Sequence, residues 1–357
     1  MPSYEVRTSQ HNYSAVVERG LIQRAGQYLP ERPGKLFVVT TEDVWTLHGG
    51  ALEKGLAGHA LEVIFFPGGE EWKRLAQVEV LAEEMVRRGG DRSSLVIAFG
   101  GGVVDDVAGF LAAVFMRGIP VIQVPTTLLA QVDAGIGGKT GVNLVSGKNL
   151  VGAFHHPLAV LSDPDVLSTL SDREYRAGLY EVIKCGVIRS PELFRLMAEN
   201  RTGVLAKAPE VVDRMVAESV RIKAEVVSAD EHERDLRRIL NFGHTYGHAL
   251  EAETGYKRFL HGEGVAFGMK AAVHLALMTV RLPEAEALRI LRTIDAYGPL
   301  PSLEGITASN LVARLSSDKK TLRGKVHFVL PESIGAVRIV SGVDETAVLA
   351  AARAALA

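Results

Sequence analysis

The first half of the chain contains a series of short β-branched runs, each ended by glycine or proline, and this pattern constrains the fold most. Continuous apolar runs are typical of strands buried on both faces of a parallel sheet. We expect strands at residues 36–40, 61–66, 95–99 and 121–124. Residues 75–88 repeat apolar side chains at helical spacing before Gly89-Gly90. Alternating strands and helices predict an α/β domain with a Rossmann-like parallel sheet.

Beyond residues 162–165 the strand patterns give way to amphipathic helices, most clearly at residues 211–227 and 264–280. Near the C-terminus, residues 325–330 and 336–340 flank a turn-like segment and predict a hairpin. A chain of 357 residues suits two domains. We expect an α/β domain over residues 1–165, and a mainly α-helical domain over residues 166–357.

Composition narrows the range of partners. The formal net charge is −2, from 40 basic and 42 acidic residues, so no global field attracts nucleic acid or anionic lipid. The sequence shows neither a signal peptide nor an apolar run of membrane-spanning length, which predicts a cytoplasmic protein. Cys185 is the single cysteine, so a metal site would need histidine and carboxylate ligands.

A glycine run follows the third predicted strand. Gly100-Gly101-Gly102 leads through Val103-Val104-Asp105-Asp106 into a helical pattern. Backbone without side chains at a helix N-terminus can approach a pyrophosphate, although such a run is equally consistent with a tight turn. It does not match the G-x-G-x-x-G fingerprint.

Two more loops follow strands at the same expected sheet edge, where α/β proteins bind ligands. In the loop at residues 67–73, Glu70 and Lys73 suit a ribose hydroxyl and a phosphate, or else form a solvated turn. In the loop at residues 125–133, Thr126 and Thr127 suit the same ligand or a helix cap. Lys139 and Lys148 then lie on glycine-rich segments, which favours an anionic ligand.

Three histidines and a carboxylate are candidates for a metal site. His244 and His248 are spaced i, i+4 on one helical face, and His261 precedes another helix. Upstream, Glu181 and Lys184 are spaced i, i+3 in an apolar helix, where a surface ion pair is the alternative. Two histidines with one carboxylate form a common catalytic zinc set. Spacing alone does not determine which two histidines are ligands.

These motifs together resemble the 3-dehydroquinate synthase family of sugar-phosphate cyclases along nearly the whole chain. The matching segments occur in family order: Gly100-Gly101-Gly102, residues 125–133, 137–141, 147–149, 181–184, 241–248 and 261–263. The resemblance implies that the domain over residues 1–165 binds NAD, and that the domain over residues 166–357 binds substrate and one divalent metal (Zn or Co). It also implies a homodimer, because an arginine at the position of Arg117 can reach a neighbouring subunit's site.

The resemblance also implies roles for individual residues. The implied metal ligands are Glu181, His244 and His261. The implied substrate and catalytic residues are Lys184, His248, Asn241, Lys139, Asp133, Asn149, Lys223, Arg237, Arg117 and Lys320. The implied NAD contacts are Gly68, Gly69, Glu70, Glu71, Trp72, Lys73, Gly101, Gly102, Val103, Val104, Asp105, Asp106, Thr126, Thr127, Lys139, Lys148, Val166, Leu167, Ser168 and Thr169.

The sequence departs from the family pattern at a few positions. Asp105 replaces a usual glycine, and would weaken pyrophosphate binding if its charge faced the ligand. Ala134-Gly135 replaces a serine pair, Tyr180 replaces a small residue, and His156 replaces a glutamine.

The implied reaction converts 3-deoxy-D-arabino-heptulosonate 7-phosphate to 3-dehydroquinate and phosphate. It proceeds through transient oxidation by NAD, phosphate elimination, re-reduction and aldol closure. Three alternatives are a metal-dependent glycerol or alcohol dehydrogenase, a sister cyclase acting on glucose 6-phosphate or sedoheptulose 7-phosphate, and a non-enzymatic NAD-binding module. Lys139, Lys148, Lys223 and Arg237 together disfavour a dehydrogenase, which has no need for so many cations.

Overall fold

The computed structural model describes residues 2–317 and 326–357, and these form two compact units. Unit 1 runs through Ser171 and also includes Val212–His232. Unit 2 comprises Asp172–Val211 and the residues from Glu233 onwards. The chain therefore leaves unit 1 six residues beyond the expected boundary, and returns to it for most of helix α7 (Pro209–Ala229). The assignment of one cofactor to each domain stays a prediction.

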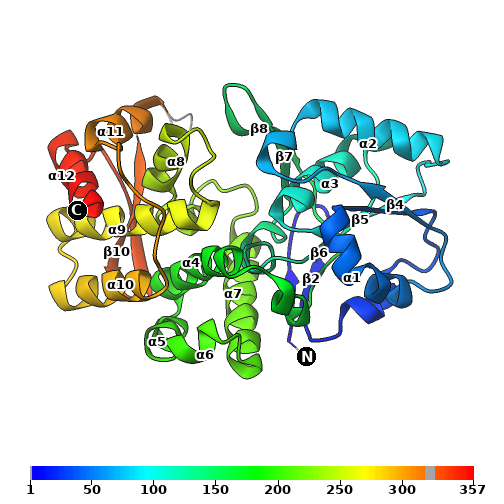
Figure 1. Cartoon of the computed structure of the whole chain (residues 1–357), viewed down its shortest axis with the longest axis horizontal. Helices are drawn as coiled ribbons and strands as arrows, with labels where there is room; N and C mark the ends of the chain where they lie inside the picture. Colours follow the sequence, from blue (N-terminus) through cyan, green and yellow to red (C-terminus); the bar gives the residue numbers. More distant parts are fainter. Residues whose placement is uncertain (1, 318–325) are drawn as a thin grey trace. The chain divides into compact units, whose positions relative to one another are not determined.

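Unit 1 is built on a seven-stranded sheet with the order β1-β2-β9-β6-β5-β3-β4 (Figure 1). Every neighbouring pair is parallel except β1–β2. Four strands confirm the predicted runs: β3 (Leu36–Thr40), β4 (Leu61–Phe65), β5 (Leu95–Gly100) and β6 (Val121–Pro125). The sequence analysis missed β1 (Ser3–Val6), β2 (Tyr13–Val17) and β9 (Ala159–Ser162).

The helices of unit 1 complete a doubly wound arrangement. The connections through α2 (Leu75–Arg87) and α3 (Gly102–Val114) run in the opposite direction across the sheet to that through α1 (Glu42–Gly55). Right-handed crossovers therefore place α2 and α3 on one face and α1 on the other. Buried side chains of α2, α3 and β3–β6 form one hydrophobic cluster.

Strand order reverses between β3 and β5, so the crevice at their carboxyl ends is the expected ligand-binding position. The loops after β4, β5 and β6 begin at this edge. A separate antiparallel hairpin, β7 (Lys139–Leu144) and β8 (Gly147–Phe154), packs against α3. Short helical turns complete the unit at Ile22–Tyr28, Glu70–Trp72, Phe115–Arg117, Ala130–Ala134 and Pro164–Thr169.

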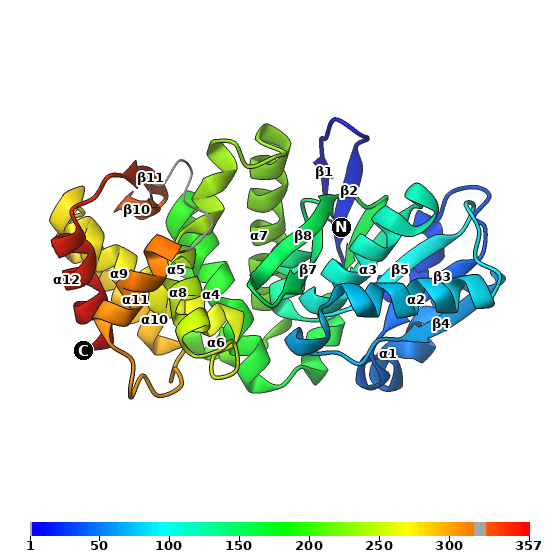
Figure 2. The same cartoon turned by 90° about the horizontal axis from the view of Figure 1, so that it is seen from above.

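Unit 2 is mainly helical, as predicted (Figure 2). Its two central helices, α8 (His244–Glu253) and α9 (His261–Thr279), pack closely against each other. The strands β10 (His327–Ser333) and β11 (Ala336–Ser341) confirm the hairpin with a tighter turn than expected. The other helical elements are α4 (Asp172–Arg189), α5 (Pro191–Glu199), α6 (Arg201–Leu205), η6 (Leu236–Asn241), α10 (Glu284–Ala296), α11 (Ala308–Ser317) and α12 (Glu345–Leu356).

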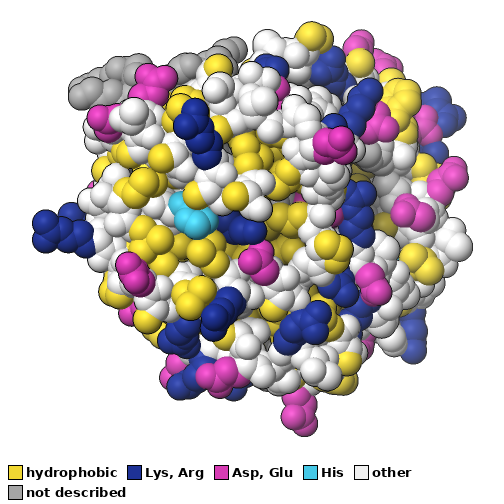
Figure 3. Space-filling model, turned by 60° about the vertical axis from the view of Figure 1, so that its left-hand side comes forward, with side chains coloured by type: hydrophobic (Ala, Val, Ile, Leu, Met, Phe, Trp, Pro, Cys, Tyr) yellow, Lys and Arg dark blue, Asp and Glu magenta, His cyan; other side chains and the backbone are white. Residues whose placement is uncertain are grey.

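The described residues include no helix that is both long and apolar enough to cross a membrane. On the face of the molecule in Figure 3, Lys and Arg side chains are interspersed with Asp and Glu side chains. This mixture agrees with the near-zero net charge of the sequence.

Candidate functional site

The glycine run joins β5 directly to α3. The amide of Thr126 donates to the Gly100 carbonyl at 2.8 Å, which holds the loop after β6 beside the loop after β5. A Cβ atom at Gly101 would lie 2.9 Å from Thr127 Cγ2, so the loop accepts only glycine there without rearrangement. The first amides of α3 lack intrahelical acceptors and are available to an anion.

Asp105, the departure in this loop, is buried inside unit 1. Its exposed fraction is 1%, and a Cβ at Gly135 would lie 3.4 Å from its Oδ2. Two departures from the family pattern are therefore neighbours, because Gly135 leaves space for the Asp105 carboxyl. Burial, with a smaller effect from the Asp106 charge, raises the pKa of Asp105 well above its usual range. This shift favours the uncharged form of the carboxyl, which lessens the expected repulsion of a pyrophosphate.

Lys73 connects the loop after β4 to α3 and to the β7–β8 hairpin. Its ammonium group is almost completely buried, pairs with Asp106, and donates to Asn149 Oδ1 at 2.5 Å. Burial raises the pKa of Asp106, and the Lys73 charge opposes that effect. The structure thus brings together three residues that lie far apart in the sequence.

Glu70 lies at the same junction. Its Oε1 accepts from Asn143 Nδ2 at 2.7 Å and lies 3.8 Å from Lys148 Nζ. Asn143 also accepts from the Asn149 amide at 2.8 Å. The sequence analysis did not single out Asn143, because an asparagine within a strand carries no motif of its own.

Asp133 and Lys223 form an ion pair within unit 1. The loop after β6 closes in a π-helical turn at Ala130–Ala134, an irregularity that is frequent at functional sites. Lys223, on α7, donates to both the carboxylate and the backbone carbonyl of Asp133. This pair fixes α7 against the loop.

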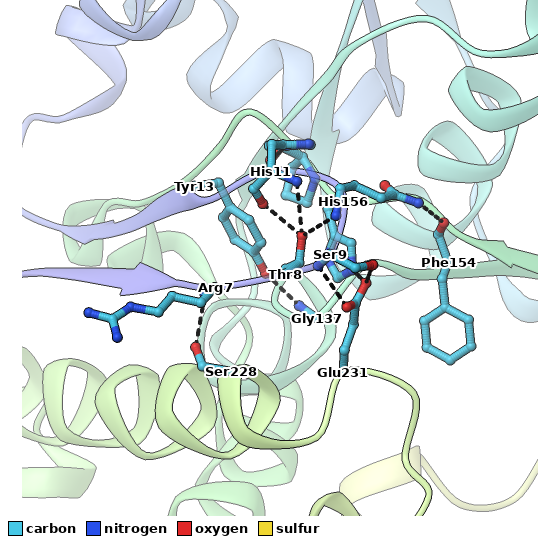
Figure 4. Close-up of polar contacts among 12 residues, drawn as sticks. Arg7, Thr8, Ser9, His11, Tyr13, Gly137, Phe154, His156, Ser228 and Glu231 are labelled. Carbon is cyan, nitrogen blue, oxygen red and sulfur yellow. Dashed lines mark hydrogen bonds and ion pairs between the residues drawn. The ribbon is translucent and has the colours of Figure 1, made fainter.

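Residues 137–138, which immediately precede Lys139, contact Tyr13 of strand β2 and His156 (Figure 4). The Gly137 amide donates to the Tyr13 hydroxyl at 2.9 Å. His156 is fully buried, and its Nε2 lies 2.9 Å from Glu231 Oε1 at the C-terminal end of α7. A Cβ at Gly138, where φ is +64°, would lie 2.6 Å from His156 Nδ1. His156 therefore packs directly under the glycine turn before Lys139.

Some predicted residues of unit 1 lie apart from these contacts. Arg117 is exposed and follows the C-terminal end of α3, whereas the glycine loop precedes its N-terminal end. Val166 and Leu167 are buried in the turn after β9. Ser168 and Thr169 bond to backbone carbonyls of the same turn. Lys320 lies outside the described residues.

The metal candidates of unit 2 converge from three helices. Glu181 on α4 is fully buried, and its Oε1 lies 3.9 Å from His244 Nε2 and 3.7 Å from His261 Nε2. The ring centroids of these two histidines are 5.1 Å apart. His248 lies beside them, and nitrogen atoms of all three histidines lie within 4.8 Å of one another.

The Nδ1 atoms of two of these histidines face oxygen acceptors. His244 Nδ1 lies 3.2 Å from the Phe242 carbonyl, and His261 Nδ1 lies 2.9 Å from Glu251 Oε1. If each Nδ1 carries the proton, both Nε2 atoms are left with lone pairs directed toward Glu181. Histidines that bind metals are usually oriented in this way.

Glu181 also pairs with Lys184, and both side chains are buried. A buried carboxylate is costly unless nearby cations compensate for it. A carboxylate that faces two imidazole nitrogens supplies the ligand types that zinc and cobalt prefer, and a divalent cation would be strongly stabilised there. The donor set therefore fits a divalent metal.

Arg237 and Asn241 lie on the short helix η6 of unit 2. Arg237 is 2% exposed, so its guanidinium is held inside the protein. The Asn241 amide donates to Glu233, a carboxylate that the sequence analysis did not single out. Glu233 occurs in a charged segment that resembles an ordinary solvated loop.

Comparison with known proteins identifies the class to which this fold and donor set belong. A solved 2-epi-5-epi-valiolone synthase from Streptomyces hygroscopicus subsp. jinggangensis 5008, with NAD+ and Zn2+ bound, superposes with a TM-score of 0.89 at 30% identity, covering 98% of each chain. A 2-deoxy-scyllo-inosose synthase with carbaglucose-6-phosphate, NAD+ and Co2+ superposes with a TM-score of 0.88 at 25% identity, covering 98% of this chain and 99% of that one. The fold is that of the sugar-phosphate cyclases.

Sequence comparison narrows the class to one family. Residues 63–177 match the model of the 3-dehydroquinate synthase N-terminal region, and residues 178–321 match that of the C-terminal region. The 3-dehydroquinate synthase of Solibacter usitatus (strain Ellin6076) is 64% identical over 357 residues, covering 100% of both chains. The chain belongs to the 3-dehydroquinate synthase family.

Proposed function

We propose that this protein converts 3-deoxy-D-arabino-heptulosonate 7-phosphate to 3-dehydroquinate and phosphate, using NAD and one divalent metal. The full-length identity of 64% to a curated 3-dehydroquinate synthase is the observation that carries this proposal. The sister cyclases named above are only 25% and 30% identical. When bound, NAD would accept a hydride from a substrate hydroxyl and return it, while the metal would acidify that hydroxyl.

Glu181, His244 and His261 are the proposed metal ligands. Three observations support this set over the three histidines alone: the buried Glu181 carboxylate, the Nε2 atoms that face it, and the acceptors at both Nδ1 atoms. His248 is then proposed to contact the substrate. Lys184, paired with Glu181, would stabilise negative charge on the substrate oxygen.

The proposed NAD site is the carboxyl edge of the unit 1 sheet. The glycine loop and the N-terminus of α3 would take the pyrophosphate, and Lys73 and Lys148 would supply positive charge. Glu70 is held by Asn143 in a position to accept from a ribose hydroxyl. The segment Val166–Thr169 is the least supported part of this site, because the hydroxyls of Ser168 and Thr169 donate to carbonyls of their own turn and that of Thr169 also bonds to His48.

Recognition of the substrate's anionic groups is proposed to be divided. Lys223 and Arg237 would bind the carboxylate, while Lys139, Asn149 and Arg117 would bind the phosphate. Asp133 and Asn241 would orient hydroxyls, and Lys320 completes the implied set. The proposed cations are divided between the two anionic groups of the substrate, which explains a cationic site in a chain of formal net charge −2.

Arg237→Ala tests recognition of the carboxylate. The variant would leave the substrate carboxylate poorly paired in a dehydrated site, at a cost of about 2–5 kcal/mol. We expect kcat/KM for the heptulosonate to fall by about 30-fold or more, at about 1.4 kcal/mol per tenfold. NAD and metal should still bind. Unchanged kcat/KM in a metal- and NAD-loaded variant would refute this role.

A homodimer is proposed from the position of Arg117. This exposed arginine follows the C-terminal end of α3, whereas the glycine loop precedes the N-terminal end of that helix. Arg117 is therefore better placed to reach the site of a neighbouring subunit than the glycine loop of its own chain. Light scattering should therefore give twice the mass of the chain. A fully active monomer would contradict the proposal.

Substrate choice separates the proposed function from its alternatives. Phosphate release should be measured with the heptulosonate, with sedoheptulose 7-phosphate and with glucose 6-phosphate, each with NAD and zinc or cobalt. Turnover is expected with the heptulosonate alone, because the other two sugars lack a carboxylate. Efficient turnover of either other sugar, with none of the heptulosonate, would identify a sister cyclase.

A further inference from the structure

Glu251 lies close to the metal candidates, although the sequence analysis gave it no role. It follows His244 by seven residues and His248 by three on α8, so all three share one face of that helix. Its side chain is 1% exposed, and its Oε1 lies 2.9 Å from His261 Nδ1. The carboxylate therefore contacts the imidazole on the ring nitrogen that does not face Glu181.

The packing of α8 against α9 holds this carboxylate in place. A Cβ at Gly247 would lie 2.7 Å from the Gly264 carbonyl oxygen, so the two backbones approach at a distance that only glycine permits. A Cβ at Gly264 would lie 3.1 Å from Glu251 Oε1. The contact between the helices thus leaves just enough space for the Glu251 carboxylate beneath His261. A side chain confined in this way cannot change rotamer without disturbing the helix pair.

His261 has two possible ways to present a nitrogen to a metal. Its Nδ1 is occupied by Glu251 at 2.9 Å, whereas its Nε2 lies 3.7 Å from Glu181 Oε1. A carboxylate accepts a hydrogen bond but donates none when ionised, so it favours the tautomer with the proton on Nδ1. That tautomer leaves the Nε2 lone pair directed at Glu181.

We propose that Glu251 is a positioning residue for the metal site, which fixes the tautomer and ring orientation of His261 so that Nε2 is the ligand atom. This inference rests on the proposed ligand set Glu181, His244 and His261. An anionic outer partner also increases the basicity of the coordinating nitrogen, beyond what the Phe242 carbonyl does for His244. The two histidines are therefore oriented by different groups, and only that of His261 can be removed by substitution.

The charges of the cluster agree with this role. The cluster contains two buried carboxylates and one buried lysine: Lys184 pairs with Glu181, and Glu251 contacts His261. A divalent cation would compensate for the excess negative charge. Glu251 therefore contributes to metal affinity through its charge as well as through the orientation of His261.

The test measures metal affinity in the absence of substrate. Zinc dissociation constants should be determined by competition with a chromophoric chelator for wild type, Glu251→Ala and Glu251→Gln. Loss of an outer-shell partner typically weakens metal binding by about 10–100-fold, which we expect for Glu251→Ala. Glu251→Gln should show a smaller loss, because its amide oxygen can still accept from Nδ1–H but carries no charge. Wild-type affinity in both variants would refute the proposal.

Glu253→Gln is the matched control. Glu253 lies on the same helix but bonds to Asn310 and Arg314 instead of a histidine. This variant loses the same charge and should bind zinc as wild type does. Thermal melting of the metal-free variants checks folding, and if Glu251→Ala fails to fold, the nearly isosteric Glu251→Gln carries the test. If Glu253→Gln lost as much zinc affinity as Glu251→Gln, the loss would come from removing one negative charge anywhere on α8. That result would refute the positioning role of Glu251.

A second readout reports the tautomer directly. In the zinc-loaded protein, imidazole ¹H–¹⁵N spectra should show His261 with a slowly exchanging proton on Nδ1, and Glu251→Ala should accelerate that exchange. Absence of this proton in wild type would overturn the proposal. His261→Ala distinguishes failure of the proposed ligand set from failure of the proposed role of Glu251. If His261→Ala retains stoichiometric zinc, the proposed ligand set is wrong. If it loses zinc while the Glu251 variants do not, only the role of Glu251 fails.

Discussion

In unit 1 the candidate site is assembled from loops that follow three different strands and from a hairpin, whereas in unit 2 it is assembled from three helices. Three candidate lysines of unit 1 are paired with carboxylates of the same unit: Lys73 with Asp106, Lys148 with Glu70, and Lys223 with Asp133. The Nε2 atoms of His244 and His261 in unit 2 instead face one buried carboxylate.

This difference has an energetic consequence. A phosphate that binds in unit 1 must share each lysine with its carboxylate or displace that carboxylate, so part of the new interaction is offset by the old one. A metal that binds in unit 2 meets donors that are already oriented by Phe242 and Glu251. Substitutions at the metal cluster should therefore have larger effects on ligand affinity than substitutions in the dinucleotide loops.

The largest effect is expected for Glu181→Gln. The variant would remove a proposed ligand and also the carboxylate charge that pairs with the buried Lys184 ammonium. Metal affinity should fall by more than the roughly 10–100-fold typical of an outer-shell partner, and turnover should be lost with it. Metal content after gel filtration, together with phosphate release, would measure both. One retained equivalent of metal at full activity would show that unit 2 does not bind metal as described.

A smaller effect is expected for Lys73→Met. This variant would remove the charge-assisted hydrogen bond proposed between Lys73 and NAD, worth about 1.5–3 kcal/mol, so the NAD dissociation constant should rise by about 10–100-fold. Calorimetric titration would measure it. Zinc affinity should not change, because Lys73 lies in unit 1. The matched control is Lys35→Met. Lys35 immediately precedes β3, at the edge of the sheet opposite to the glycine loop, and its ammonium group donates to the Arg88 carbonyl. Equal NAD affinity in both variants would show that NAD does not bind beside Lys73.

The smallest effect is expected for Asp105→Asn. Burial raises the folded-state pKa of Asp105, so the folded state binds a proton that the unfolded state releases. The stability of the wild type therefore decreases as pH rises from the usual aspartate range toward the raised pKa. The asparagine side chain of the variant does not titrate, so the melting temperature of the variant relative to wild type should increase across that window. NAD affinity near neutral pH should hardly change. A relative melting temperature independent of pH would show that Asp105 is not buried uncharged.

The sequence predicted the core of unit 1 because strands buried on both faces appear as continuous apolar runs. The edge strand β1 and its neighbour β2 were missed since they are short and mix polar with apolar residues. The β7–β8 hairpin was interpreted only as glycine-rich segments, because glycine weakens the strand pattern. The segment Val212–His232, which contains most of α7, belongs to unit 1 through contacts such as those of Glu231 with Ser9 and His156. No local sequence pattern encodes such contacts.

The candidate site was predictable where its chemistry is concentrated in motifs. The histidines and Glu181 were found by residue type and spacing, and the family resemblance selected among them. The outer partners Glu251, Asn143 and Glu233 were missed, because a single glutamate or asparagine has meaning only beside its partner. The spacing of seven residues from His244 to Glu251 was the one available signal, since it places both on the same helical face. The proximity of Asp105 to Gly135 likewise follows from tertiary packing alone.

In the proposed reaction, NAD is a cofactor that is regenerated in every turnover of a phosphate-eliminating cyclisation. The most direct test is the ratio of phosphate released to NAD supplied, with the heptulosonate in large excess and zinc or cobalt present, while NADH absorbance is followed. We predict that many phosphates are released per NAD supplied and that NADH does not accumulate. Accumulation of one NADH per substrate oxidised, without phosphate release, would contradict it and assign the chain a dehydrogenase activity.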